Sequence, residues 1–146
     1  MSLTGVWMNE LKSIMVLREH SDGTLIGKYR SLVGRDPHTR HLTGVASTDE
    51  GGKQIVGFVV RFQVDNPGLG YGHYSVCTWS GWIRDNEITT HWLLTLSLLN
   101  QVDEWSSTLI GEDSFEKVSD DPNDEHLESD MATLKTLLTN ARTSQA

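Results

Sequence analysis

Cysteine, proline and positive charge are scarce in this sequence of 146 residues. The single cysteine, Cys77, excludes an intrachain disulfide and leaves the compartment undecided. Twenty acidic residues against 12 lysines and arginines give a formal charge of −8, which argues against nucleic acid as a partner, because nucleic-acid-binding proteins present a basic face. No apolar run approaches the length of a membrane span, so we expect no membrane partner either.

Targeting and metal-binding signals are also missing. Met1 and Ser2 are followed at once by a strand-like segment rather than by a signal peptide. Localisation therefore stays open: secreted if a leader was removed, otherwise intracellular. His38 and His41 have a spacing that metal ligands use, but no cluster of cysteines or carboxylates accompanies them, so we expect no metal site.

Tryptophan (5) and glycine (13) are plentiful, and the length suits one domain with a real core. Short segments rich in β-branched and aromatic residues alternate with turn signals such as Ser21-Asp22-Gly23. This alternation predicts eight strands, over residues 3–9, 12–18, 24–31, 41–47, 54–64, 74–84, 87–97 and 105–118. The chain is therefore predicted to be an all-β protein.

Regular strand spacing, with a turn between successive strands, favours an eight-stranded antiparallel up-and-down barrel over residues 1–118. Closure would leave no exposed sheet edge; a sandwich is the alternative. Residues 119–146 read as an acidic linker followed by a short amphipathic C-terminal helix. In that tail, apolar residues recur at helical spacing: Met131, Leu134, Leu137, Leu138 and Ala141.

The stretch from Asp103 to Phe115 is the predicted closing strand, and Asp113 is its most informative residue. A carboxylate that points into a barrel needs partners, because burial of an unpaired charge is very costly. Residues two apart in a strand share a face. This rule groups Tyr29 with Ser31, Ser75 with Cys77 and Trp79, Trp92 with Leu94, and Phe58 with Val60 and Phe62.

If these faces point inward, the barrel holds an aromatic wall and a group of polar side chains. The wall comprises Phe62, Trp79 and Trp92, and the polar group comprises Asn9, Ser13, Tyr29, Ser31, Ser75 and Asp113. Convergent polar groups at one end of an apolar cavity are typical of a small-molecule site. On the pattern alone, an aromatic stripe of this kind is more often structural core than a pocket wall.

An enzyme is disfavoured by the same face rule. His91 neighbours Trp92 and so points outward, where it cannot act with Asp113 inside one barrel. No nucleophile elbow is present. Besides a small-molecule binder, the open alternatives are a carrier of apolar ligands, a hydrolase using one of the serines, and a module that takes up a peptide.

Five segments in matched order resemble the avidin and streptavidin family: TGVWMNEL (4–11), DGTLIGKY (22–29), TWSG (78–81), HWLLT (91–95) and WSSTLIGEDSF (105–115). The resemblance covers about residues 3–118. It implies an eight-stranded barrel that holds one small ligand, biotin, without turnover and without a cofactor. It also implies a homo-oligomer, a tetramer by default, with a dimer or a larger assembly possible.

The resemblance assigns a role to each site residue. Asn9, Ser13 and Tyr29 match donors to the ureido oxygen of biotin, and Ser31 and Asp113 match acceptors of its N–H groups. Phe62, Trp79, Trp92 and Leu94 match the walls around the ring and the valeryl chain. Val33, Gly34 and Arg35 fall in the loop that covers the ligand, and Ser75 falls near the biotin carboxylate. Trp105 matches a tryptophan given to a neighbouring subunit's pocket.

Three features depart from a simple transfer of the family pattern. Cys77 stands where the family has a threonine hydroxyl near the biotin sulfur, and a thiol is a weaker donor. Arg35 replaces a polar residue in the covering loop. Trp105 and Asp113 are eight residues apart and share a face in a regular strand, although the resemblance sends them to different pockets. Twist or a bulge near Gly111 would reconcile the two, and the sequence leaves both alternatives open.

Overall fold

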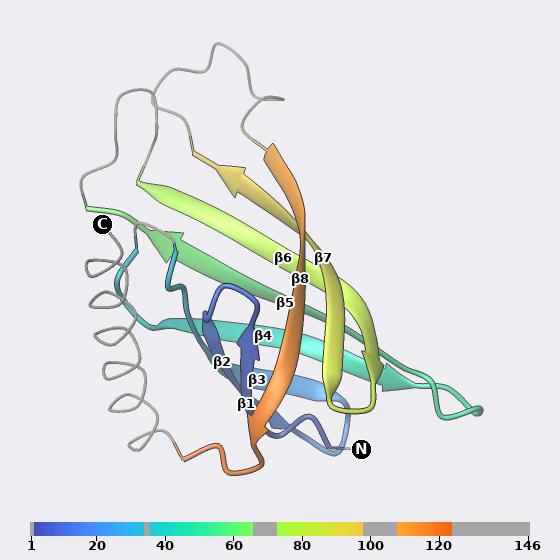
Figure 1. The fold of residues 1–146 in the computed structure, drawn as a ribbon. Coiled ribbons are helices and arrows are strands. Elements are labelled where there is room, and N and C mark those ends of the chain that lie inside the picture. The colour runs from blue at the N-terminus through green and yellow to red at the C-terminus, as the bar shows by residue number, and fades with distance from the viewer. Residues whose placement is uncertain (1, 34–35, 66–72, 98–107, 124–146) are drawn as a thin grey trace.

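The computed structural model describes residues 2–33, 36–65, 73–97 and 108–123, and every regular element in these segments is a β-strand. The strands are β1 (Gly5–Asn9), β2 (Ile14–Glu19), β3 (Thr24–Arg30), β4 (Arg40–Thr48), β5 (Gln54–Gln63), β6 (Tyr74–Arg84), β7 (Glu87–Leu96) and β8 (Thr108–Ser119). Each pairs antiparallel with its sequence neighbours, and β8 pairs with β1. The sheet therefore closes into the predicted up-and-down barrel, and the sandwich is excluded (Figure 1).

The observed strand bounds lie close to the predicted ones. β1 begins at Gly5 rather than at residue 3. β2 begins at Ile14 rather than at Lys12, because the φ of Lys12 is 68°, a left-handed value that a strand cannot contain. The C-terminal helix predicted within residues 119–146 lies outside the described residues. In the described segments, no helix is long and apolar enough to cross a membrane.

The β7–β8 ladder has no bulge near Gly111. The β7–β8 ladder runs in register from Glu87 opposite Glu116 to Thr95 opposite Thr108, with Gly111 opposite Trp92. The register shifts instead in the β1–β8 ladder, between Val6 and Trp7. Of the two ways to reconcile Trp105 with Asp113, the bulge is therefore absent from the described part of β8. Trp105 itself lies outside the described residues.

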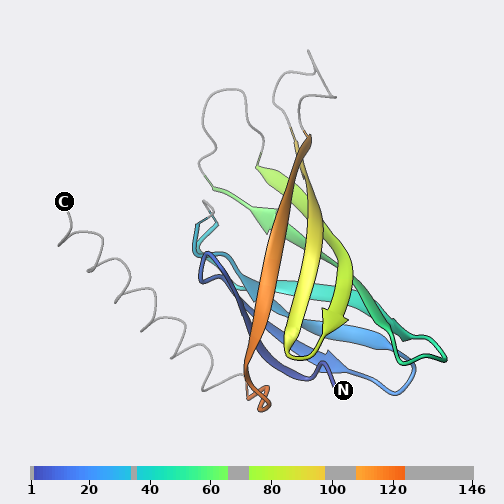
Figure 2. The ribbon, with the colours of Figure 1, turned by 45° about the vertical axis from the view of Figure 1, so that its right-hand side comes forward.

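Two halves of the barrel wall differ in height. β1, β2 and β3 contain 5, 6 and 7 residues, whereas β5 to β8 contain 10 to 12. The longer strands lie side by side and extend past the shorter ones at one end of the barrel (Figure 2). That end is consequently more open on the side of β1–β3.

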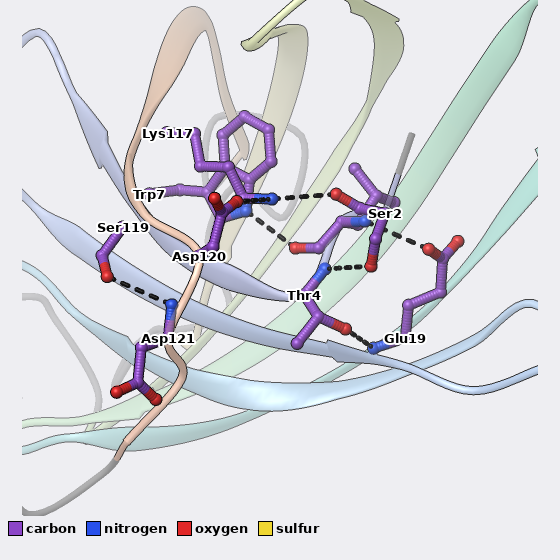
Figure 3. A network of polar contacts seen from close by, with 9 residues as sticks. Ser2, Thr4, Trp7, Glu19, Lys117, Ser119, Asp120 and Asp121 are labelled. Atoms are coloured by element: carbon purple, nitrogen blue, oxygen red, sulfur yellow. Dashed lines mark hydrogen bonds and ion pairs between the residues drawn. The ribbon is translucent and has the colours of Figure 1, made fainter.

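The opposite end is closed by the N-terminal segment (Figure 3). Leu3 is fully buried, and its carbonyl accepts a 2.9 Å hydrogen bond from Nε1 of Trp7. Lys117 Nζ lies 5.6 Å from the Trp7 ring centroid and donates to the Ser2 carbonyl at 3.0 Å. Gly5 has a φ of 145°, and a Cβ there would meet the Ser119 carbonyl oxygen at 2.3 Å. This packing leaves the other end of the barrel for a ligand.

Candidate ligand-binding site

A cavity of about 310 Å³ opens at the end of the barrel away from Leu3. This volume falls in the lower range of small-molecule pockets. Every predicted site residue within the described segments lines it: Asn9, Ser13, Tyr29, Ser31, Val33, Phe62, Ser75, Cys77, Trp79, Trp92, Leu94 and Asp113. The other three predicted residues, Gly34, Arg35 and Trp105, lie outside the described residues. These residues come from six strands and from the connections between strands.

The side-chain oxygen of Asn9 accepts hydrogen bonds from the turn that follows β1. Its Oδ1 accepts hydrogen bonds from the backbone N–H of Leu11 at 3.1 Å and of Ser13 at 2.8 Å. These bonds support the left-handed backbone at Lys12. With the oxygen held this way, the amide nitrogen remains as the donor of the side chain, and Asn9 lowers the pKa of the neighbouring Asp113. Asn9 thus presents a donor to the cavity floor.

Ser13 and Tyr29 form a second donor group at the floor. Both side chains are buried, and Ser13 is a polar neighbour of the Tyr29 phenol. Ser13 Oγ also accepts the backbone N–H of Leu32 at 3.0 Å. Burial, reinforced by the negative charge of Asp113, raises the pKa of Tyr29 above its ordinary value, although the Ser13 side chain acts to lower it. Tyr29 therefore stays a neutral phenol that can donate.

Asp113 is the acceptor of the floor. The side chain is 9% exposed, and its Oδ2 accepts a 2.8 Å hydrogen bond from Nε1 of Trp79. Thr90 Oγ1 donates to the backbone carbonyl of Asp113 at 3.0 Å, which fixes that residue across the β7–β8 pair. Burial raises the pKa of Asp113 to about 6, an effect that the Trp79 bond opposes and the nearby Glu10 carboxyl strengthens.

The apolar wall is an aromatic stack. Trp79 lies over Phe58 at 5.0 Å and 18°, and Tyr29 lies 5.0 Å from Trp79 on a tilted plane. Phe62 meets Tyr29 edge to face at 5.8 Å. Such stacked and edge-to-face pairs hold rings in place beyond simple area burial. The wall therefore combines a flat apolar surface with the polar floor.

Trp92 depends on a glycine in the facing strand. A Cβ on Gly111 would lie 2.2 Å from Cζ2 of the Trp92 ring, so the indole lies directly over the glycine. No side chain could stand there without displacing the indole. Gly111 is thus a packing position of the cavity wall rather than a bend in the strand.

Cys77 lies within the cavity wall and is buried. Burial, with a further contribution from Asp113, raises the pKa of its thiol to about 12. The thiolate is the reactive form of cysteine, so this thiol is largely unreactive at neutral pH. Cys77 acts here as a small apolar wall residue.

Four lining residues were missed by the sequence reasoning: Leu11, Asp36, Val64 and Leu96. Asp36 is the notable one, because it is 3% exposed and bonded from several sides. Arg40 holds it through Nε at 2.6 Å and Nη2 at 3.1 Å, and the backbone N–H of Gln63 donates at 2.8 Å. The sequence signal that could have identified Asp36 is its spacing of four residues from the basic Arg40.

The chemistry of this arrangement is binding. His91 points outward, and its Nε2 lies 3.2 Å from Oε1 of the exposed Glu112, as the face rule predicted. Among the described residues, no group of three histidine, cysteine, aspartate or glutamate side chains could hold a metal ion. The floor offers several donors and one acceptor, and the wall offers flat apolar surface.

Comparison with known protein families agrees with this geometry. The family model described as the avidin family matches residues 1–118, a stretch that includes β1 to β7 and all of β8 except its last residue, Ser119. The match covers most of the chain and all of the residues that line the cavity. The chain therefore belongs to the avidin family, a family of biotin-binding proteins that are not enzymes.

Proposed function

We propose that the cavity binds biotin non-covalently, with no cofactor. The observation that carries the proposal is the convergence of buried polar groups on one point of the floor. Asn9, Ser13 and Tyr29 supply donors there, and Asp113 supplies an acceptor carboxylate. A cyclic urea needs this combination, because its oxygen accepts hydrogen bonds while its nitrogens donate them.

Each part of the ligand has a matching surface. The ureido group lies among Asn9, Ser13, Tyr29, Ser31 and Asp113. Phe62, Trp79, Trp92 and Leu94 pack against the fused rings and the valeryl chain, with Cys77 beside the sulfur. Ser75, nearer the cavity mouth, and the segment of Val33, Gly34 and Arg35 complete the site around the carboxylate end. A carrier of apolar ligands would not need four buried polar side chains at its floor, because each is costly to bury without a partner.

Titration calorimetry with biotin tests the proposal. Tyr29→Phe and Asp113→Ala should each weaken binding by roughly tenfold or more, because loss of one partner leaves the others unsatisfied at about 1–3 kcal/mol. Tyr74→Phe is the matched control, since Tyr74 lies outside the cavity and is half exposed. Tight binding of a long-chain fatty acid in place of biotin would support the apolar-carrier alternative and overturn the proposal.

We also propose that the protein works as a homo-oligomer in which a neighbour's Trp105 completes each pocket. Large apolar side chains are exposed on the outer face of neighbouring strands: Val45, Ile55, Val59, Val76, Trp82, Leu93 and Ile110. Several lie directly opposite one another, including Ile55 with Trp82 and Leu93 with Ile110. Contiguous exposed apolar surface of this kind marks protein–protein contact.

Light scattering distinguishes the assembly states. Leu93→Lys with Ile110→Lys should reduce the oligomer number, because it places charge in the middle of this face. Val118→Lys, a change on the same strand at the closed end, should leave the oligomer number unchanged. A wild-type protein that is monomeric and binds biotin normally, with no effect of Trp105→Ala, would contradict the assembly proposal.

The same measurements test the division of the chain. We propose that the barrel alone holds the ligand and that the C-terminal tail affects assembly only. A chain ending at Asn123 keeps the 3.1 Å bond from Arg18 Nη2 to the Pro122 carbonyl, the last long-range contact described for the barrel. It should bind biotin as the full chain does, and a large loss of affinity would show that the tail belongs to the site.

A further inference from the structure

The outer face of β1 and β2 carries a small group of apolar side chains. Val6 lies directly opposite Val16, and Met8 directly opposite Ile14, so the four are neighbours across the two strands. Trp7, between Val6 and Met8, points into the barrel core. Because successive residues of a strand face opposite ways, Val6 and Met8 point out of the barrel, as do their partners on β2. Together these four residues form the β1–β2 patch.

This patch is buried although it faces outward. The outer-face apolar residues of β4 to β8 named above are between 37% and 74% exposed. Val6, Ile14 and Val16 are only 5%, 6% and 2% exposed, and these fractions are those of a single chain. A side chain on the outside of a sheet reaches such values only where something lies on it. The cover must therefore come from the same chain.

The described residues do not provide this cover. Val6, Ile14 and Val16 form a cluster separate from the barrel core, and Met8 is the only other apolar residue of the described segments that packs against it. The Nε atom of Arg30, which lies opposite Ile14, is buried too and has no hydrogen-bond partner among the described residues. The cover is consequently a part of the chain outside those segments.

The C-terminal segment is the part that begins beside the patch. Arg18 points outward from β2, and its Nη2 donates to the Pro122 carbonyl at 3.1 Å, so the chain that leaves β8 reaches the outer face of β2. Residues 124–146 continue from this point. The other internal segments outside the described residues begin beside the cavity, close after residues that line it: Val33, Val64 and Leu96.

The sequence of the C-terminal segment suits an apolar face. Its apolar residues recur at the spacing of one side of a helix: Met131, Leu134, Leu137, Leu138 and Ala141. A helix of this length is marginal in water by itself, because most helical stability in proteins comes from packing of the apolar side. The β1–β2 patch offers such a surface.

The charges around the patch match as well. Across the β2–β3 ladder the patch is bordered by Lys28 and Arg30, and along β2 by Arg18. These three side chains form a basic rim. Residues 120–130, which lead into the apolar stripe, contain six acids and no lysine or arginine. Opposite charges on two surfaces favour their approach and fix their register.

We propose that residues 129–142 pack as an amphipathic helix on the β1–β2 patch of their own barrel, with the acidic segment beside the basic rim. The tail then keeps this face out of contacts between subunits, which leaves the outer face of β4 to β8 for assembly. The inference is independent of biotin binding. It rests on the proposed assembly only for this consequence, because cover of the patch is measured separately from oligomer number.

Thiol labelling of the full chain measures the cover directly. Val16→Cys places a thiol in the patch, and Cys77 adds little background because it is buried and its thiol pKa is raised. The Val16→Cys thiol should react at least about tenfold more slowly than that of Lys53→Cys, an exposed position in the β4–β5 turn. Equal rates would show that the patch is open and would overturn the proposal.

A pair of charges in the apolar stripe should remove the cover. Leu134→Asp with Leu138→Asp, added to Val16→Cys, should speed labelling about tenfold, because carboxylates cannot pack on the patch without a large cost. Thr136→Asp with Thr139→Asp is the matched control, since it adds the same charge on the opposite side of the helix. Continued protection in the leucine variant would assign the cover to another segment and overturn the proposal.

Disulfide formation distinguishes the chain's own tail from that of a neighbour. Val16→Cys is combined in turn with Leu134→Cys, Leu137→Cys and Leu138→Cys, and each variant is oxidised mildly. At least one pair should cross-link within a single chain, seen as a monomer of changed mobility on a denaturing gel without reductant. Cross-linked dimers in place of this monomer would assign the cover to a neighbouring subunit, which overturns docking on the same barrel.

Light scattering tests the consequence for assembly. Leu134→Asp with Leu138→Asp should at least double the mean particle mass, because an exposed apolar patch promotes association. Addition of Val16→Lys should restore the wild-type mass by placing charge in the patch itself. An unchanged mass in the leucine variant would overturn the role in assembly. Absence of biotin binding by the wild type would overturn the proposed function, and the labelling rates would still decide the position of the tail.

Discussion

The Nε1 atom of Trp79 lies 2.8 Å from Oδ2 of Asp113, so the largest ring of the cavity wall also holds the acceptor of its floor. A single rigid side chain thereby sets the position of both the apolar and the polar recognition surface. Asp36 lines the same cavity and is also buried, yet its pKa shifts the opposite way. Burial alone would raise the pKa of Asp36, but the hydrogen bonds from Arg40, Gln63 and His38 lower it below the ordinary value.

Replacement of Asp113 by asparagine should stabilise the ligand-free protein at neutral pH. Because the folded state raises the pKa of this carboxyl from 3.8 to about 6, its contribution to stability is present below about pH 4 and lost as pH rises through 6. Asp113→Asn should therefore gain about 1–2 kcal/mol relative to wild type between pH 4 and pH 7, measured by denaturant unfolding. An equal difference at both pH values would show that ionisation of Asp113 costs the fold nothing.

Replacement of Asp36 by asparagine should have the reverse pH dependence. A lowered pKa adds stability above about pH 4, and that stability is lost as pH falls through the folded-state value. Asp36→Asn should lose about 1–3 kcal/mol at pH 7 and progressively less in acid. Arg40→Lys keeps the charge but not the two-pronged bond, so a smaller loss is expected. A constant loss at every pH would point to packing rather than charge.

An alanine at position 111 should damage the pocket more than the fold. The added Cβ would overlap the Trp92 ring, which must move away from the wall. Biotin affinity should drop about tenfold, with a stability loss of roughly 1–3 kcal/mol. Gly57→Ala is the control, because a Cβ there meets its nearest atom at an ordinary 3.6 Å. Equal calorimetric affinities for the two variants would remove Trp92 from the binding surface.

At the closed end, Lys117→Met should destabilise the barrel without weakening biotin binding. The ammonium group forms a 2.8 Å ion pair with Asp120, reaches the Ser2 carbonyl and lies over Trp7. Loss of these contacts should cost about 1–2 kcal/mol in thermal unfolding. The exposed Lys53→Met change is the control for charge alone. A matching fall in biotin affinity would mean that the two ends of the barrel are coupled.

Much of the fold and most of the cavity lining could be predicted because alternation acts within each strand. Ser75, Cys77 and Trp79 were placed together by spacing alone, and all three line the cavity. Asp36 lies in a connection between strands, where spacing carries no information about direction. Its position depends on a local bond to Arg40 and on a bond from the backbone N–H of Gln63, 27 residues away at the end of β5.

Glu10 and Gly111 show two further limits. Glu10 contacts β8 from the turn that contains the left-handed Lys12. The alternation of residues in a strand does not predict such a turn. A bulge at Gly111 was one of the alternatives that the sequence left open, but this glycine makes room for the Trp92 ring instead. Glycine permits both a backbone bend and the close approach of a neighbouring side chain, so its identity alone cannot distinguish the two.

Closure of the barrel by its first and last strands also bears on how the molecule is made. Val6 pairs with Ser119. The edge of β1 that faces β8 is therefore unpaired until almost the whole barrel has been synthesised. Contacts so distant along the chain form slowly, and an open strand edge invites wrong pairing meanwhile. A nascent chain halted before residue 108 would lack both Asp113 and the strand that seals β1, and so could not retain ligand. Ligand capture is consequently among the last events of folding.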